Sequence, residues 1–395
     1  MLNILLILIF IRPFISSLAF PYLNSIYTYS LLIFLLFWTI FKGLPIKEIK
    51  PIRYPFVVFV FSLLISAFFS QSRISSLREL LSYAAGLMVF LACASLSWKD
   101  KFTIIRTIIL AGVIIGLLAL YQYFFGFSHI LDYISKMKIN DHFALDYIER
   151  QRVFFPFITP NTLAGYLILV IPLALINEGK RKYLILAPLL SALFLTQSLG
   201  AFLSLFLGIG LYFYLRKDFS GREFTLLLIL AVVSISVFSL RQAATKEHIL
   251  PAFSFFKRLA YWRDTLKIIK THPFIGIGLG NFRLPLARYA HNIYLQIWAE
   301  IGILGVFSFL WLIAAILKST LKKVGHSIHK KEITSLDIAC LVFLIHNSLD
   351  FTFFLPELSL IWLTLLGLVF TFSASPKMRK QEKSILFSPK KHLCC

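Results

Sequence analysis

Residues 102–126 read FTIIRTIILAGVIIGLLALYQYFFG, a run of 25 residues in which Arg106 is the one charged side chain. About 20 mainly apolar residues are enough to cross the roughly 30 Å hydrocarbon core of a membrane as a helix. A segment in lipid must satisfy its backbone polar groups internally, so this stretch is predicted to be helical. It indicates that the chain belongs in a membrane.

Eleven further apolar runs accompany it. The twelve runs cover about 2–20, 26–41, 54–70, 79–97, 102–126, 161–177, 182–197, 200–215, 224–241, 292–317, 334–349 and 356–374. The 395 residues are 58% hydrophobic and include 41 Phe, and the mean hydropathy is +0.82. A soluble domain is nearer 45–50% apolar. We therefore predict an all-α polytopic integral membrane protein of about 12 transmembrane helices, forming a single transmembrane domain over residues 1–395.

The positive charges are distributed unevenly over the gaps between these runs. Alternate gaps and the tail at 375–395 hold 23 Lys and Arg, whereas the short gaps 21–25, 71–78, 198–199 and 350–355 hold only Arg73 and Arg78. Because Lys and Arg favour the cytoplasmic side of a membrane, both termini and the basic tail are predicted to be cytoplasmic. Orientation in the membrane thus explains the net charge of +22, and no nucleic-acid partner is expected.

Two of the outward gaps, 127–160 and 242–290, are long enough to favour a function. In the second, helical spacing of about 100° per residue groups apolar side chains on one face. These are Phe255, Leu259, Trp262, Leu266 and Ile269. We expect an amphipathic helix that lies in the outer membrane interface. Arg258 falls at the edge of the apolar stripe. It is either a snorkelling side chain or a guanidinium that grips a lipid phosphate.

The segment HPFIGIGLGNF, from His272 to Phe282, ends that helix. Gly276, Gly278 and Gly280 allow an irregular turn whose backbone approaches a neighbour closely. Without a preceding strand of a βαβ unit, these glycines are weak evidence for phosphate binding. A plain re-entrant turn explains them equally well.

His291 and Asn292 open the tenth run, beside a basic loop. An ionisable residue at the mouth of a membrane helix is a candidate functional residue, and a neutral His can accept a proton from a hydroxyl. The alternative is a His that only marks the interface. Glu300 lies nine residues further on and is expected to tie helices together by hydrogen bonds. Gly302 and Gly305 beside it permit close helix packing.

Polar residues also mark two other helix ends. Arg152 precedes Asn161, which can cap the sixth run, and Asp350 follows His346 by one turn at the end of the eleventh. The chain has no HExxH, CxxC or paired-acid spacing, and its four Cys show no metal pattern. We therefore expect no metal and no cofactor.

These residues resemble the shared pattern of the O-antigen ligase/polymerase superfamily of bacterial membrane enzymes. The resemblance covers about 152–370. It rests on Arg258-(x)3-Trp262, His272-Pro273 through the glycines to Phe282, His291-Asn292-(x)2-Leu295 with Glu300, Gly302 and Gly305, Arg152 with Pro160-Asn161-Thr162-Leu163-Ala164, and His346 with Asp350. One departure is Thr196-Gln197-Ser198-Leu199-Gly200, where many members have Ser-Arg-Gly. Either the role of the missing Arg passes to Arg152 or Arg288, or the activity is altered.

The resemblance implies a metal-independent, inverting transfer of a glycan from a polyprenyl-diphosphate-linked donor, such as an undecaprenyl diphosphate, to a sugar hydroxyl of lipid A–core. This would occur at the periplasmic face of the inner membrane, with 242–290 as the catalytic loop and membrane lipids as surroundings. His291 and Arg258 would be catalytic. Arg152, Arg288, Asn161 and Asn292 would contact the diphosphate or the glycan, and Trp262, Gly278, Gly280, Glu300 and Asp350 would support the site.

One dominant outer loop favours a ligase, and a polymerase of the same superfamily is the alternative. A glycolipid transporter or a non-catalytic membrane scaffold are alternatives of a different class. The ionisable residues gather at the outer ends of the runs, whereas a transporter needs them deep in the bundle.

Overall fold

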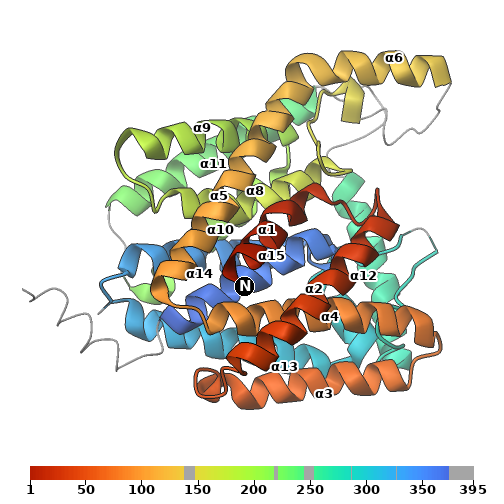
Figure 1. Ribbon diagram of the computed structural model, residues 1–395. Helices are drawn as coiled ribbons and strands as arrows, with labels where there is room; N and C mark the ends of the chain where they lie inside the picture. The colour runs from red at the N-terminus through yellow and green to blue at the C-terminus, as the bar shows by residue number, and fades with distance from the viewer. Residues whose placement is uncertain (138–146, 218–220, 244–252, 286, 326, 373–395) are drawn as a thin grey trace, which may run out of the picture.

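The computed structural model describes residues 1–137, 147–217, 221–243, 253–285, 287–325 and 327–372. Within these ranges the chain is a bundle of helices without a β-sheet (Figure 1). The helices are α1 (Leu2–Ile11), α2 (Pro21–Lys42), α3 (Arg53–Phe68), α4 (Arg73–Ala94), α5 (Trp98–Tyr121), α6 (Phe127–Met137), α8 (Pro160–Ala174), α9 (Gly179–Thr196), α10 (Leu199–Arg216), α11 (Gly221–Ala243), α12 (Phe253–Thr271), α13 (Ile293–Val324), α14 (Lys330–His346) and α15 (Pro356–Phe372).

Each of the twelve apolar runs contains one of these helices, and α6 and α12 lie outside the runs. Five segments are long and apolar enough to cross a membrane: Pro21–Lys42, Lys50–Phe68, Arg73–Ala94, Trp98–Asp132 and Ile293–Lys322. Shorter apolar helices cover Leu2–Phe14, Pro160–Ala174, Leu199–Leu215, Leu227–Val237 and Pro356–Phe370. The all-helical membrane class is confirmed. A crossing by each of the twelve helices stays a prediction.

Helix α8 lies at the centre of the bundle. Every residue from Pro160 to Ala174 is buried except Asn161 at its first turn. Its neighbours are α14, α9, α5 and α10. A helix that is apolar all round is stable only when it is covered on all sides, and its sequence PNTLAGYLILVIPLA meets that condition. The burial of α8 holds Asn161 in a fixed place at one end of the bundle.

The first long gap differs from the expected loop, because its first part is helical. Helix α5 continues through one π-helical turn at Gln122–Gly126 into α6, which projects from the bundle (Figure 1). The Gln122 side chain accepts hydrogen bonds from the backbone N–H groups of Phe154 and Phe155, at 2.8 and 2.9 Å. This amide anchors the returning segment and so places Arg152 near the end of α8.

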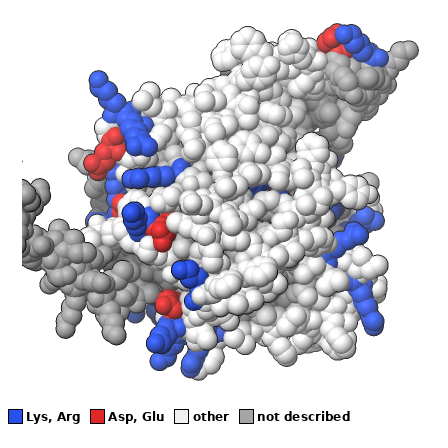
Figure 2. Space-filling model, viewed as in Figure 1, with Lys and Arg blue, Asp and Glu red and all other residues white. Residues whose placement is uncertain are grey.

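Charged side chains gather at two opposite edges of the face in Figure 2, and a broad uncharged band separates them. At one end of the bundle the Lys331 ammonium pairs with Glu178 at 3.0 Å, and the rings of Trp98 and His329 lie in contact. These residues belong to three gaps that are predicted to be cytoplasmic, so gaps assigned to the same side lie together. The basic tail, 375–395, falls outside the described residues.

Candidate active site

Residues 272–282 pack against α13 at the place where that helix is interrupted. The backbone N–H groups of Ile277 and Gly278 donate to the carbonyl oxygens of Ala299 and Glu300, at 2.9 and 3.1 Å. These carbonyls are freed because α13 is interrupted at Gly302, where φ is 72° and ψ is −176°. Only glycine adopts this backbone conformation readily. A side chain on Gly302 would also meet the Phe274 carbonyl oxygen.

The glycines of this segment allow it to approach other helices closely. A Cβ on Gly278 would meet Ser70, just before α4, and a Cβ on Gly280 would meet Glu79 and the Ser75 carbonyl on α4. The Ser76 hydroxyl donates to the Leu279 carbonyl. The close approach of this turn is therefore to α4 and α13, and it serves packing.

Glu300, on α13, is hydrogen-bonded to the same turn. Its carboxylate accepts a hydrogen bond from the Gly280 backbone N–H at 2.9 Å and another from the Gln296 side chain at 2.9 Å. Gln296 in turn accepts from the Ala290 backbone N–H at 3.0 Å. A carboxylate in a membrane helix is costly unless it is hydrogen-bonded, and here both oxygens are satisfied. This is the helix-tying geometry expected for Glu300.

The face of α12 that packs onto the protein lies beside the apolar stripe expected from its sequence. Thr265 is fully buried, and the Tyr261 ring lies against His291. Arg258 is three residues before Tyr261 and seven before Thr265, so it shares this packed face. The expected stripe is largely exposed at Phe255, Leu259 and Leu266. Arg258 therefore lies at the border between the packed face and the exposed stripe, and its guanidinium points into the protein toward Asp350.

Arg258 reaches the end of α14. Its Nη2 lies 3.5 Å from Oδ2 of Asp350, and the side chains are 20% and 2% exposed. The same carboxylate oxygen accepts from the Asn161 side chain at 3.1 Å. Its other oxygen accepts from the Phe351 backbone N–H at 2.8 Å. Asp350 thus orients both an arginine from α12 and an amide from α8.

Arg152 completes this arrangement from the other side of Asn161. Its Nη2 donates to Oδ1 of Asn161 at 3.4 Å, and its Nε donates to the Thr196 carbonyl at 3.0 Å. The Ser198 hydroxyl also donates to Asn161 at 3.2 Å. Arg152 therefore lies against the turn between α9 and α10, where the sequence lacks the family arginine. Of the two arginines expected to replace it, Arg152 lies at this turn and Arg288 lines a pocket elsewhere.

His291 lies beside this group, immediately before α13. Its backbone has a φ of 53°, which is uncommon for a residue with a side chain. The imidazole is stacked on Tyr261 with ring centroids 5.7 Å apart and meets Phe351 edge-on at 4.8 Å. Burial lowers the pKa of His291, Asp350 opposes this shift, and Arg258 adds to it. The lowered pKa keeps the ring neutral near pH 7, so one of its nitrogens is free of a proton.

Three buried nitrogen atoms at this place have no hydrogen-bond partner among the described residues. They are Nε of Arg258, Nε1 of Trp262 and Nδ1 of His291. Buried polar groups in native proteins are nearly always paired. Arg258 and Trp262 lie one turn apart on α12, and His291 packs against Tyr261 of the same helix. The arrangement fits a site that pairs them with an oxygen-rich anion.

Asn292, an expected substrate contact, is hydrogen-bonded within the protein. Its side-chain oxygen accepts from the backbone N–H groups of Tyr294 and Leu295, both at 3.0 Å, which caps α13. Its amide donates to the Ser348 carbonyl at 3.0 Å. Because the side chain is engaged within the protein, Asn292 fixes the start of α13 against the end of α14 and so positions His291.

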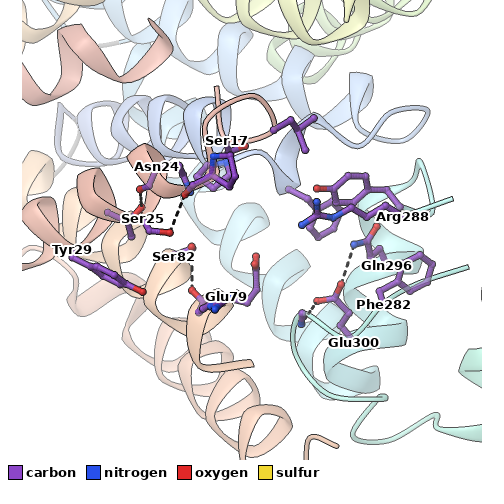
Figure 3. A pocket seen from close by; sticks show the side chains of 18 residues that line it. Ser17, Asn24, Ser25, Tyr29, Glu79, Ser82, Phe282, Arg288, Gln296 and Glu300 are labelled. Carbon is purple, nitrogen blue, oxygen red and sulfur yellow. Dashed lines mark hydrogen bonds between the residues drawn. The ribbon is translucent and has the colours of Figure 1, made fainter. Parts of the chain in front are cut away.

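Arg288 lies apart from the other two arginines. It is exposed and lines a pocket of about 320 Å³ between α2, α4 and α13 (Figure 3). Its guanidinium lies over the Tyr289 ring at 5.5 Å. The sequence analysis missed Glu79 and Gln296, which line the same pocket. The signal for Glu79 was present, because a carboxylate near the start of an apolar run is a candidate functional residue by default.

The fold and the site define a helical membrane protein with a cluster of arginine, carboxylate and imidazole groups at one end of its bundle. Residues 184–310 match the family model described as O-Antigen ligase. This match confirms the resemblance to the O-antigen ligase/polymerase superfamily, a glycosyltransferase-like class of enzymes whose substrates are lipid-linked glycans and polysaccharides. The chain has no match among the curated proteins.

The matched range contains only part of the cluster. Arg258 and His291 lie inside it, whereas Arg152, Asn161 and Asp350 lie outside it. The fold therefore joins residues of the matched domain to residues from α8 and α14. Across the described ranges, no three His, Cys, Asp or Glu side chains are grouped so as to hold a metal ion.

Proposed function

We propose that the protein transfers a glycan from a polyprenyl-diphosphate-linked donor to a sugar hydroxyl of lipid A–core, as an O-antigen ligase does. The observation that supports this most is the line of side chains Arg152, Asn161, Asp350 and Arg258, with His291 beside it. A diphosphate is an anion rich in oxygen acceptors, and arginine binds phosphate oxygens with two parallel N–H donors.

The chemistry follows from the roles of these groups. The acceptor hydroxyl gives its proton to the neutral His291 imidazole, and its oxygen attacks the anomeric carbon of the donor sugar. The bond from that carbon to the diphosphate oxygen breaks, and the electron pair leaves with the diphosphate. The negative charge that develops on the leaving group is stabilised by Arg258 and Arg152 at a site largely shielded from water. Attack from the opposite face of the sugar inverts the anomeric centre.

Asp350 has a positioning role in this scheme. Being 2% exposed and bonded to both Arg258 and Asn161, it holds the guanidinium in one orientation before substrate arrives. Such preorganisation lowers the cost of reorganisation during the reaction. Metal ions are not required, because arginine supplies the positive charge that metal ions supply in many other phosphate sites.

The cluster is proposed to face the periplasm, on the outer side of a bacterial inner membrane, with both termini in the cytoplasm. The gaps with few positive charges meet at the site end of the bundle: Ser76 and Asp350 contact the second long loop, and Ser198 contacts Asn161 at the start of α8. The gaps rich in Lys and Arg meet at the other end. This arrangement agrees with the positive-inside rule.

A polymerase of the same superfamily is the second candidate, because the family match and the arginine cluster suit both reactions. The glycolipid banding pattern of a deletion strain distinguishes them. A ligase deletion removes all long chains from lipid A–core, whereas a polymerase deletion leaves a single repeat unit on the core. An unchanged pattern would contradict both assignments.

A further inference from the structure

The pocket that contains Arg288 is distinct in position from the Arg152–Arg258 pair. It is bounded by α2, by the first turns of α4, by the segment from Gly280 to Tyr289 and by the start of α15. At about 320 Å³ it falls at the lower end of the range of about 300–1,000 Å³ for small-molecule sites. Figure 3 shows polar side chains from α2 and α4 facing Gln296 and Glu300 across it.

The lining of this pocket is mostly polar. Twelve of its eighteen residues have polar side chains: Ser17, Asn24, Ser25, Thr28, Tyr29, Arg78, Glu79, Ser82, Arg288, Tyr289, Gln296 and Glu300. The formal charges of the two arginines and the two glutamates among them sum to zero. A pocket of neutral net charge that is rich in hydroxyl, amide and carboxylate groups suits a neutral ligand with many hydroxyls. It suits an acyl chain poorly, because burying those groups in hydrocarbon is costly.

Glu79 is the side chain that most clearly requires a ligand. Among the described residues, no group donates a hydrogen bond to its carboxylate, whose charged neighbours are Glu300 and Arg288. Glu300 has both oxygens occupied by Gly280 and Gln296. A carboxylate accepts up to four hydrogen bonds, and sugar hydroxyls are suitable donors.

Aromatic rings cover another part of the wall. Phe282, Tyr289 and Phe354 line the pocket, and Tyr289 is stacked on Phe354 with centroids 6.1 Å apart. Rings of this kind supply large, rigid apolar contact area. Together with Glu79, they provide both the apolar and the hydrogen-bonding contacts that a sugar ring offers.

One aromatic residue connects this pocket with His291. The Tyr289 ring is parallel to that of Phe351 at 4.7 Å, and Phe351 meets His291 at 4.8 Å. The pocket and the arginine pair therefore lie on two sides of the same aromatic group. Two substrates that approached from these two sides would meet at the imidazole.

We propose that this pocket binds a neutral sugar of the acceptor glycan, with its hydroxyls directed at Glu79 and its ring against Tyr289 and Phe282. The assignment of this sugar to the acceptor rests on the proposed function. The binding of a sugar in the pocket does not depend on any transfer reaction. The pocket would hold the acceptor while the arginine pair holds the donor diphosphate.

Sugar binding is tested without catalysis. Saturation-transfer NMR on the purified protein in lipid nanodiscs, with the methyl glycosides of glucose, galactose and a heptose as probes, should show binding of at least one glycoside. Ser25→Phe places a ring in the pocket and should abolish the signal. The matched control Ser30→Phe lies on the same helix at an exposed position outside the pocket and should keep it. Absence of binding in the wild type, or equal binding by both variants, would overturn the proposal.

The carboxyl group is tested by Glu79→Gln, which retains the shape of the side chain and replaces one acceptor oxygen by an amide that donates. Loss of one hydrogen bond should weaken binding of the same glycoside about tenfold. In a transfer assay with lipid-linked donor and lipid A–core, the variant should raise the KM for the acceptor about tenfold and leave the KM for the donor unchanged. A rise confined to the donor KM would contradict the assignment.

Arg258→Ala separates this proposal from the proposed function. It should abolish transfer and leave glycoside binding intact. If glycosides bind while Arg258→Ala still transfers glycan, the diphosphate site is wrong and the sugar pocket stands. If Arg258→Ala is inactive and no glycoside binds to the wild type, the sugar pocket is wrong and the diphosphate site stands.

Discussion

Among single residues, His291 has the most specific surroundings, because two aromatic rings, a carboxylate and a guanidinium all act on its imidazole. Its neighbours have opposite effects on its charge. Burial and Arg258 favour the neutral ring, whereas Asp350 favours the imidazolium. The neutral form prevails, which suits a group that must accept a proton.

Replacement of His291 tests its role as a base. His291→Ala and His291→Gln should both bind the lipid-linked donor, because the arginines bind the diphosphate, and both should transfer glycan about 10²–10⁴-fold more slowly. Donor binding and transfer rate are measured separately on purified protein. A His291→Gln variant with a rate near that of the wild type would show that the residue only positions the substrate by a hydrogen bond.

The pH dependence of transfer follows from the lowered pKa of His291. The base is active above its pKa and is lost as the pH falls through it, so the acid limb of the rate profile should lie below the ordinary histidine value of about 6.5. Asp350→Asn removes the charge that stabilises the imidazolium, so the limb should move to lower pH while the rate falls. The exposed His129 provides the control, and His129→Gln should leave the limb in place.

Arg258 tests whether charge alone is sufficient. Arg258→Ala and Arg258→Lys should both lose transfer by about 10²-fold or more while the protein still inserts, because lysine keeps the charge and loses the two-pronged contact with phosphate. Arg263 lies on the same helix and is exposed, so Arg263→Lys is the matched control. Full activity in Arg258→Lys would mean that the site needs only a cation at this position.

Among the elements, the interruption of α13 decides the shape of the site. The break at Gly302 leaves backbone carbonyls of α13 free to accept hydrogen bonds from the segment 273–278. This segment links α12, which holds Arg258, to the loop that holds His291. A straight α13 would give those carbonyls to its own helix. The loop would then lose its anchor.

Gly302→Ala measures this effect against a matched glycine. Gly43 has nearly the same backbone conformation, with φ 74° and ψ 168°, but a Cβ there would meet nothing within 4 Å. Gly43→Ala should cost the backbone strain alone, roughly 1–3 kcal/mol. Gly302→Ala should lower the thermal stability further and reduce transfer, because its Cβ would lie 1.9 Å from the Phe274 oxygen. Equal stability losses would show that the loop does not depend on this contact.

Over the whole molecule, α13 sets the distance between the two ends of the bundle. The part after the break at Gly302, residues 303–324, is long enough at 1.5 Å per residue to extend about 33 Å, which matches the roughly 30 Å hydrocarbon core. The site lies before its first residue, and the Lys-rich turn near Lys330 follows its last. The two ends of the helix should therefore face opposite sides of the membrane.

Reporter fusions test this topology. A reporter at Gly280 should be active only in the periplasm, and a reporter at Lys330 only in the cytoplasm. The charge distribution over the gaps supports this orientation. The same compartment at both positions would contradict the twelve-span arrangement, and the reverse orientation would place the proposed site on the wrong side for an outer-face transfer.

Hydropathy and short motifs depend only on neighbours along the chain. The helical membrane class, the location of the twelve apolar helices and the resemblance to the O-antigen ligase/polymerase superfamily could therefore be predicted from the sequence. The tertiary structure alone decided which faces of those helices meet. In a membrane protein both the lipid-facing and the protein-facing sides of a helix can be apolar. Periodicity therefore cannot show that Arg258 turns inward to Asp350. For the same reason, the sequence could not show that Arg288 lies apart from Arg152. It also could not show that Glu79 lines a pocket together with residues more than 200 positions away.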